Sequence, residues 1–191
     1  AAAAAAKATE LEFFPGLVIA VAPYMVAGDI NDFDDAKAIF GRANTRLEQA
    51  KKFYVIDGYV SDHVALLQQQ SKLYHYLATY ETEIKRRLAM ETRRTTMLMP
   101  LLKTLSRASF EGLHKQISFE VGETFLVLLD IKIEKFRGKN PYGTVEPRTL
   151  KPAEITNCNN YVLSGLAMFT HYISFFAPVH LPDGSENPMT R

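Results

Sequence analysis

Residues 109–136 read SFEGLHKQISFEVGETFLVLLDIKIEKF, and this stretch decides the fold. Its large apolar side chains recur three or four positions apart: Phe110, Leu113, Ile117, Val121, Phe125, Leu128 and Leu129. Side chains at that spacing share one face of an α-helix, because the helix turns once in about 3.6 residues. The alternation at residues 131–133 is too short to indicate a strand. The stretch therefore predicts one long helix with an apolar face.

Helical spacing continues on the N-terminal side of this stretch. Asn31, followed closely by three aspartates, is typical of a helix start, and Gly58 is the predicted stop. Ser61 is the predicted cap of a second helix over residues 61–98. Pro100 ends or kinks that helix, because proline lacks the amide hydrogen and crowds the preceding turn.

The residues that follow the stretch 109–136 predict one more helix. Residues 137–150 hold two glycines and two prolines and predict a loop. Pro152 and Glu154 then open a helix, since proline suits the first turn and a carboxylate suits the positive end of the helix dipole. Pro178 ends it. No segment alternates with a period of two for long enough to predict a sheet, so the predicted fold class is all-α.

These helices fit antiparallel helix pairs stacked as a solenoid better than they fit a four-helix bundle. Helix pairs recur at roughly 35 to 45 residues, which is the spacing of helical repeats. The helical domain is expected over residues 31–178, with the loop 137–150 inside it. Residues 1–30 form an N-terminal segment without a predicted fold, and its six leading alanines carry no chemical signal. Residues 179–191 form a polar tail.

The composition carries no nucleic-acid or membrane signal. The 191 residues are 47% hydrophobic and 23% charged, which is enough apolar material for a core. A formal net charge of +1 argues against a nucleic-acid partner, which requires a clear basic excess. The most apolar stretch, residues 17–27, is interrupted by Pro23 and is shorter than the ~20 residues of a membrane span, so no membrane insertion is expected. The single cysteine, Cys158, cannot form an internal disulfide, which favours a reducing compartment.

No set of residues predicts catalysis, a metal or a cofactor. Glu111 and His114 have the spacing of half a di-iron carboxylate site, but the sequence has no second Glu-x-x-His pair, so solvated helix faces are the preferred interpretation. His75 stands between two tyrosines, where aromatic packing is expected. Asp62 and His63 begin a predicted helix, where Asp62 suits the helix dipole and His63 is expected to bond a neighbouring turn, so a structural capping role is preferred to catalysis for both. The sequence predicts a binding or scaffolding protein rather than an enzyme.

The basic run at residues 85–94 is the charge concentration that could bind a partner. Arg86, Arg93 and Arg94 are predicted to share one helical face, and they are the candidate partner-binding residues. Two glutamates lie four positions before basic residues of this run, which favours ion pairs on the helix surface. A solvated, internally paired helix is therefore the preferred alternative to a surface for an acidic partner.

Several short segments carry a resemblance to a known family. Residues 57–64 read DGYVSDHV, and shorter matches follow at residues 71–74, 98–100, 116–120 and 130–132. On these segments the chain resembles the C-terminal part of the KIF-binding protein family, whose members are kinesin-binding regulators built from tetratricopeptide-like helix pairs. The resemblance covers roughly residues 40–135 and thins beyond them. It implies a tetratricopeptide-like α-solenoid.

Residues 118–125 fit the first helix of a tetratricopeptide repeat. Val121 and Phe125 take packing positions, and Gly122 takes the position at which two helices approach closely. Ser118 stands where the repeat has a large aromatic side chain, so this repeat is degenerate.

The resemblance implies a non-catalytic adaptor that binds kinesin motor domains and regulates their engagement with microtubules. In the family the surface that holds the motor involves helices upstream of the matched region, so the resemblance assigns no motor-contact residue here. The alternative is a structural component of a microtubule assembly, such as a cilium or a cortical array, with tubulin or a microtubule-associated scaffold as its partner. Both functions place the chain in the cytoplasm at the cytoskeleton.

Overall fold

The computed structural model describes residues 30–137 and 151–176, and every regular element in these residues is a helix. In chain order the helices are α1 (Phe33–Phe53), α2 (Val60–Tyr80), α3 (Ile84–Leu98), the single turn α4 (Leu101–Thr104), α5 (Glu111–Arg137) and α6 (Pro152–Ile173). The all-α prediction is confirmed for the described residues.

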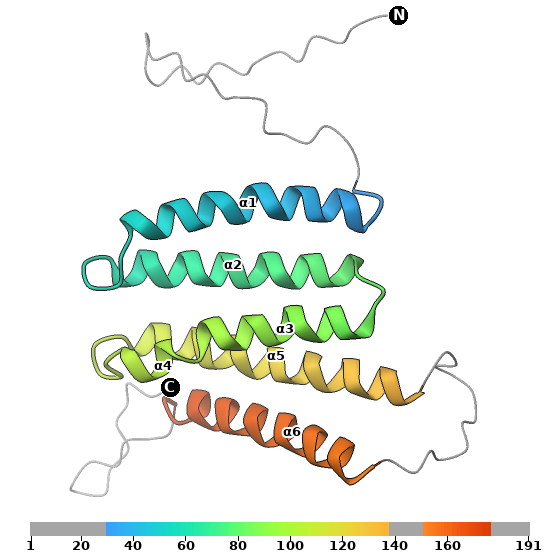
Figure 1. Cartoon of the computed structure of the whole chain (residues 1–191). Helices are drawn as coiled ribbons and strands as arrows, with labels where there is room; N and C mark the ends of the chain where they lie inside the picture. The colour runs from blue at the N-terminus through green and yellow to red at the C-terminus, as the bar shows by residue number, and fades with distance from the viewer. Residues whose placement is uncertain (1–29, 138–150, 177–191) are drawn as a thin grey trace, which may run out of the picture. The chain divides into compact units, whose positions relative to one another are not determined.

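The helices pack in the order of the sequence. α1 lies against α2, α2 against α3, α3 against α5, and α5 against α6. Each long helix runs antiparallel to the one before it, and α4 makes part of the turn between α3 and α5 (Figure 1). α1 and α6 therefore lie at the two ends of a row of helices.

The first two helices begin and end slightly away from their predicted bounds. Asp32 caps α1 instead of Asn31, because its Oδ1 accepts the backbone N–H of Asp35 at 2.9 Å. α1 ends at Phe53, well before Gly58, and α2 begins at Val60 without a side-chain cap. The predicted cap by Ser61 is therefore wrong.

The predicted helix over residues 61–98 is two helices, which is the main correction to the sequence-based fold. The chain reverses at residues 81–83, where Glu81 and Glu83 have extended backbones. Glu81 Oε1 accepts the backbone N–H of Glu83 at 2.9 Å and so satisfies an amide that a continuous helix would have used. Neither glycine nor proline marks this turn in the sequence.

The last two helices follow the prediction closely. α5 covers residues 111–137 against a predicted 109–136. α6 begins at Pro152, and the Glu154 side chain accepts the backbone N–H of Lys151 at 3.1 Å. α6 ends at Ile173, before the predicted stop at Pro178. Nearly all of the predicted N-terminal segment and loop, and the whole C-terminal tail, lie outside the described residues.

The buried core lies between α2, α3, α4 and α5. It consists of aliphatic and aromatic side chains from these helices and their turns: Val64, Leu98, Leu101, Leu105, Ile117, Val121, Phe125 and Leu128. Each fully buried side chain of this size stabilises the fold by about 1.5–3 kcal/mol through the hydrophobic effect. The stretch 109–136 supplies half of this cluster, as its apolar spacing predicts.

α5 and α6 approach each other closely at two glycines. A Cβ atom on Gly122 would lie 2.9 Å from the Phe169 ring, and one on Gly165 would lie 3.4 Å from Phe125 Cβ. The prediction that Gly122 permits close helix packing is confirmed. In the described parts of the chain, none of the helices combines the length and apolarity that crossing a bilayer requires.

Candidate functional site

The three candidate arginines lie on α3 but do not share one surface. Arg86 and Arg93 are exposed, whereas Arg94 is 7% exposed and faces α2 and α5. The prediction of one shared exposed face is therefore wrong for Arg94. The physical reason is its helical position: with Glu91, Thr95 and Leu98 it belongs to the buried side of α3.

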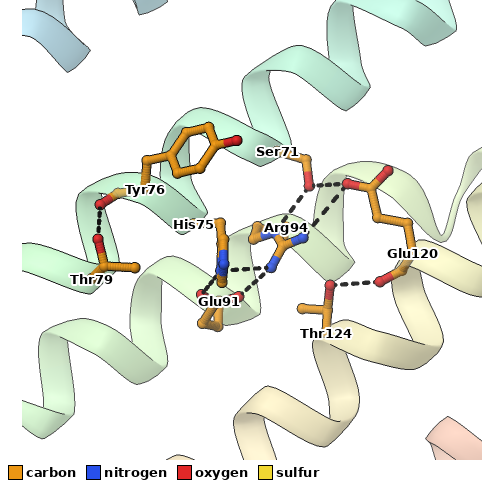
Figure 2. Close-up of polar contacts among 8 residues, drawn as sticks. All are labelled: Ser71, His75, Tyr76, Thr79, Glu91, Arg94, Glu120 and Thr124. Atoms are coloured by element: carbon orange, nitrogen blue, oxygen red, sulfur yellow. Dashed lines mark hydrogen bonds and ion pairs between the residues drawn. The ribbon is translucent and has the colours of Figure 1, made fainter.

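Arg94 is the centre of a buried polar network that joins three helices, and we call this set the Arg94 network: Ser71, His75, Glu91, Arg94 and Glu120 (Figure 2). One guanidinium N–H of Arg94 donates to Glu91 Oε2 at 2.7 Å, and Nε donates to Ser71 Oγ at 3.0 Å. Ser71 Oγ in turn donates to Glu120 Oε1 at 2.6 Å. The second terminal nitrogen of Arg94 lies 3.6 Å from the same Glu120 oxygen.

His75 closes the network on the α2 side. Its Nδ1 lies 2.9 Å from Glu91 Oε1 and 3.3 Å from a terminal nitrogen of Arg94. A carboxylate only accepts and a guanidinium only donates, so the shorter contact requires a hydrogen on Nδ1. Its contact with the adjacent Tyr76 ring, 6.1 Å between centroids, is secondary. The expected aromatic role of His75 is therefore joined by a stronger polar one.

A second polar group links α1 to α2. Gln70 donates to Asn44 Oδ1 and to Glu48 Oε1, each at 2.7 Å, and accepts from the Lys51 ammonium at 2.9 Å. Lys51 also lies 2.8 Å from Glu48. The hydrogen bonds from Lys51 and then Gln70 hold the pKa of Glu48 below its usual value. These polar contacts join α1 to α2 together with the edge-to-face contact of Phe40 and Tyr74, whose ring centroids lie 4.8 Å apart.

The exposed arginines are partly engaged on their own surface. Arg86 Nε lies 3.0 Å from Glu83, and one of its terminal nitrogens lies 3.5 Å from Glu81. The backbone N–H of Glu83, together with the smaller effect of Arg86, holds the pKa of Glu81 below its usual value. Arg87 bonds both carboxylate oxygens of Glu134 on α5 at 2.8 Å. These pairs support the internally paired alternative for part of the basic run.

Glu111 and His114 do not form half of a metal site. Glu111 is exposed and lies 2.6 Å from the Lys115 ammonium, whereas His114 is buried and its Nε2 donates to the Leu105 carbonyl at 3.1 Å. The expected solvated face is therefore wrong for His114. In residues 30–137 and 151–176 no group of three or more metal-ligating side chains comes together.

His114 instead pairs with a histidine of α6. Its Nε2 donates to the Leu105 carbonyl, and its Nδ1 lies 3.3 Å from His171 Nε2, so the two rings share one hydrogen bond. Burial, with smaller effects of Arg107 and His114, lowers the pKa of His171. His63 behaves as expected, since its Nδ1 lies 2.7 Å from the Tyr54 carbonyl in the preceding turn.

Sequence reasoning missed most of the Arg94 network. Ser71 and Glu120 lie in segments that carry the family resemblance, but no local spacing connects the two residues, which lie far apart in the chain. A signal was present for Glu91 and Arg94, because both stand at helical spacing from the apolar Leu88 and Leu98. Charged side chains at apolar positions of a helical pattern indicate a buried ion pair.

Comparison with known proteins gives one consistent result. The family profile described as "KIF-1 binding protein C terminal" matches residues 3–190. The KIF-binding protein of Danio rerio is 35% identical over 102 residues, which are 53% of this chain and 16% of that protein. The KIF-binding protein of Homo sapiens is 36% identical over 102 residues with the same coverage, and that of Dictyostelium discoideum is 29% identical over 96 residues, which are 50% of this chain and 16% of that protein. The chain thus spans about a sixth of the length of these relatives. No solved structure matches it significantly.

Proposed function

The chain belongs to the KIF-1 binding protein C-terminal family, and from this membership we propose that it is a non-catalytic helical adaptor that binds kinesin motor domains. The observation that carries the proposal is the profile match over nearly the whole chain. The relatives carry the name KIF-binding protein. We further propose that the adaptor regulates whether the bound motor engages microtubules.

The helical architecture suits such an adaptor. Sequential antiparallel helices present long side-by-side faces, and we propose that they form tetratricopeptide-like pairs of an α-solenoid. The Arg94 network ties α2, α3 and α5 together, so the exposed side of α3 is held by contacts on its buried side. A surface held in this way loses little conformational entropy when a partner binds.

Arg86 and Arg93 are the proposed partner contacts. Both are exposed on α3, and an acidic surface of a motor domain or of tubulin would complement them. Arg94 is not included, because it is already engaged by Glu91 and Ser71 in the interior. This part of the proposal narrows the candidate surface to two of the three arginines.

A pull-down with kinesin motor domains tests the proposal. The variant Arg86→Glu with Arg93→Glu is compared with the wild-type chain and with a matched control, Lys37→Glu with Arg42→Glu, which reverses the same number of exposed charges on α1. Motor binding is expected to fall for the α3 variant and to remain for the control. Wild-type binding should also weaken as salt rises, because charges at the surface are screened over about 10 Å at 0.1 M.

Microtubule co-sedimentation separates the adaptor from the scaffold alternative. An adaptor that acts on motors is expected to bind motor domains and to reduce their sedimentation with microtubules. A scaffold in a cilium or another microtubule array would itself sediment with microtubules in the absence of a motor. Wild-type protein that captures no motor domain would overturn the adaptor proposal, and motor capture unchanged by the α3 variant would remove Arg86 and Arg93 from it.

A further inference from the structure

Two histidines join the C-terminal end of α6 to α5, and we call them the His114–His171 pair. His114 Nδ1 lies 3.3 Å from His171 Nε2, and the ring centroids are 5.5 Å apart. The other nitrogen of His114 donates to the Leu105 carbonyl at 3.1 Å. Both nitrogens of His114 are therefore engaged inside the protein, where this residue is only 2% exposed.

The contact between the two rings limits how many protons the pair can hold. A hydrogen bond between two nitrogens requires a lone pair on one of them, and a protonated imidazole carries a hydrogen on both of its nitrogens. If both rings were protonated, two N–H groups of two positively charged rings would face each other at 3.3 Å. At least one ring is therefore neutral while the contact exists.

The basic residues around the pair oppose a second positive charge. Arg107, from the turn between α4 and α5, packs on the Phe175 ring at 4.3 Å, and Lys115 of α5 lies 5.8 Å from the centre of the same ring. Phe175 itself packs edge-on against His171, with 5.1 Å between the ring centroids. Lys103, the charged residue of α4, is also a cation.

The carboxylates of the helices around the pair are engaged elsewhere. Glu111 of α5 is exposed and lies 2.6 Å from the Lys115 ammonium. Glu91 of α3 and Glu120 of α5 pair with Arg94. Residues 155–176 of the α6 region contain no charged residue other than histidine. A second proton on the pair would therefore lack an anionic partner in this part of the structure.

The sign of the pH dependence follows from these surroundings. Burial, with smaller effects of Arg107 and His114, lowers the pKa of His171 below its usual 6.5. In the unfolded chain these causes are absent, so near this pH the unfolded chain binds more protons than the folded chain. The stability that the contact contributes is thus complete above about pH 6.5 and is lost as the pH falls through the lowered value.

We propose that the His114–His171 pair is a pH-sensitive latch on the C-terminal end of α6. Near neutral pH it holds this end on α5, and acidification releases it. The middle of α6 stays in place, because Gly165 packs closely against Phe125 in the core. The end can move separately, since its other contacts include an exposed hydrogen bond from Arg107 to Ser174 Oγ.

Hydrogen–deuterium exchange of the full chain at about pH 7.5 and about pH 5.5 tests the proposal, with rates corrected for the intrinsic pH dependence of amide exchange. Amides in the last two turns of α6 are expected to lose protection by about tenfold at the lower pH, because a pKa difference of one unit corresponds to a tenfold change in the equilibrium. Amides around Val121 in the middle of α5 should keep theirs. Unchanged protection of the α6 end would overturn the proposal, and so would an equal loss in α5.

His171→Gln distinguishes the pair from other titratable groups. Glutamine places an uncharged amide near the position of His171 Nε2, so the α6 end should stay protected at the lower pH. The matched control His63→Asn replaces a histidine of α2 whose Nδ1 lies 2.7 Å from the Tyr54 carbonyl, and it should retain the wild-type pH response. A loss of protection in His171→Gln as large as in the wild type would overturn the proposal.

A measurement on the wild-type chain does not depend on the folding of any variant. Nitrogen NMR of the labelled imidazole rings reports which rings are charged. Both rings of the pair should be charged only under conditions in which the α6 end has lost its protection. Two charged rings in a chain whose α6 end is still protected would overturn the latch.

Discussion

Two neighbouring arginines, Arg93 and Arg94, show how one residue position changes the role of a charge. Arg93 is exposed, and Arg94 is held between α2, α3 and α5. The sequence shows the basic run, but it does not show that Arg94 is buried, because the partners Ser71 and Glu120 come from other helices. A buried charge is tolerated only where its partners are already in place.

Removal of the Arg94 guanidinium should destabilise the fold strongly. Arg94→Met keeps much of the side-chain volume but leaves the Glu91 and Glu120 carboxylates without their cation, and we expect a loss of about 3–5 kcal/mol in the free energy of unfolding. Urea denaturation followed by circular dichroism measures this loss. Arg93→Met is the matched control and should change the stability by less than about 0.5 kcal/mol. Equal stability of the two variants would contradict the network.

At the scale of the helices, apolar spacing predicted α5 and α6 well and failed between α2 and α3. For α5, the helical spacing of the apolar residues agrees with the glycine- and proline-containing segment that follows it. The apolar face of α5 supplies half of the core cluster. The turn at residues 81–83 has no glycine or proline, and Glu81 makes it through a side-chain hydrogen bond to the Glu83 backbone. Such a hydrogen bond depends on the tertiary packing that reverses the chain, so the local sequence does not predict the turn.

The contact between α5 and α6 gives a prediction at this scale. Gly122→Leu should force the two helices apart, because even a Cβ atom there would lie 2.9 Å from the Phe169 ring. Overpacking of this kind costs about 1–3 kcal/mol, which thermal denaturation would register as a lower Tm. Gly112→Leu on the same helix is the matched control, since a Cβ at Gly112 meets nothing within 4 Å. That change should leave the Tm unchanged or raise it, because leucine favours the helix more than glycine does.

Across the whole molecule, the apolar core is concentrated in the middle of the row of helices. α2 to α5 supply the buried cluster, whereas Ala36 is the one buried residue of α1, a helix that the structure describes in full. α1 is instead held by polar contacts with α2 that reach solvent. The all-helical class and the approximate positions of α1, α5 and α6 were predictable from the sequence, but this uneven distribution of burial was not, because it depends on which helices become neighbours.

Rates of backbone hydrogen exchange should differ among the helices in the same way as their share of the buried core. Backbone amides of α5 are expected to exchange most slowly, since their helix opens only when the core opens. Amides of α1 should exchange faster, because α1 contributes no side chain to the buried core cluster. Mass spectrometry of deuterium uptake by peptides from each helix measures the difference. Protection of α1 equal to that of α5 would show that the chain opens in a single step.

The Arg94 network also sets the axial position of α3. Aliphatic side chains repeat along a helix, so apolar packing alone would tolerate a slip of one turn, about 5.4 Å, at modest cost. Such a slip would carry the Arg94–Glu91 pair along, because both residues lie on α3, but it would take Arg94 away from Ser71 and Glu120 and take Glu91 away from His75. α3 therefore has one permitted alignment against α2 and α5. Any partner that binds Arg86 and Arg93 therefore meets both side chains at fixed positions along the axis of α3, because the helix cannot slide against its neighbours.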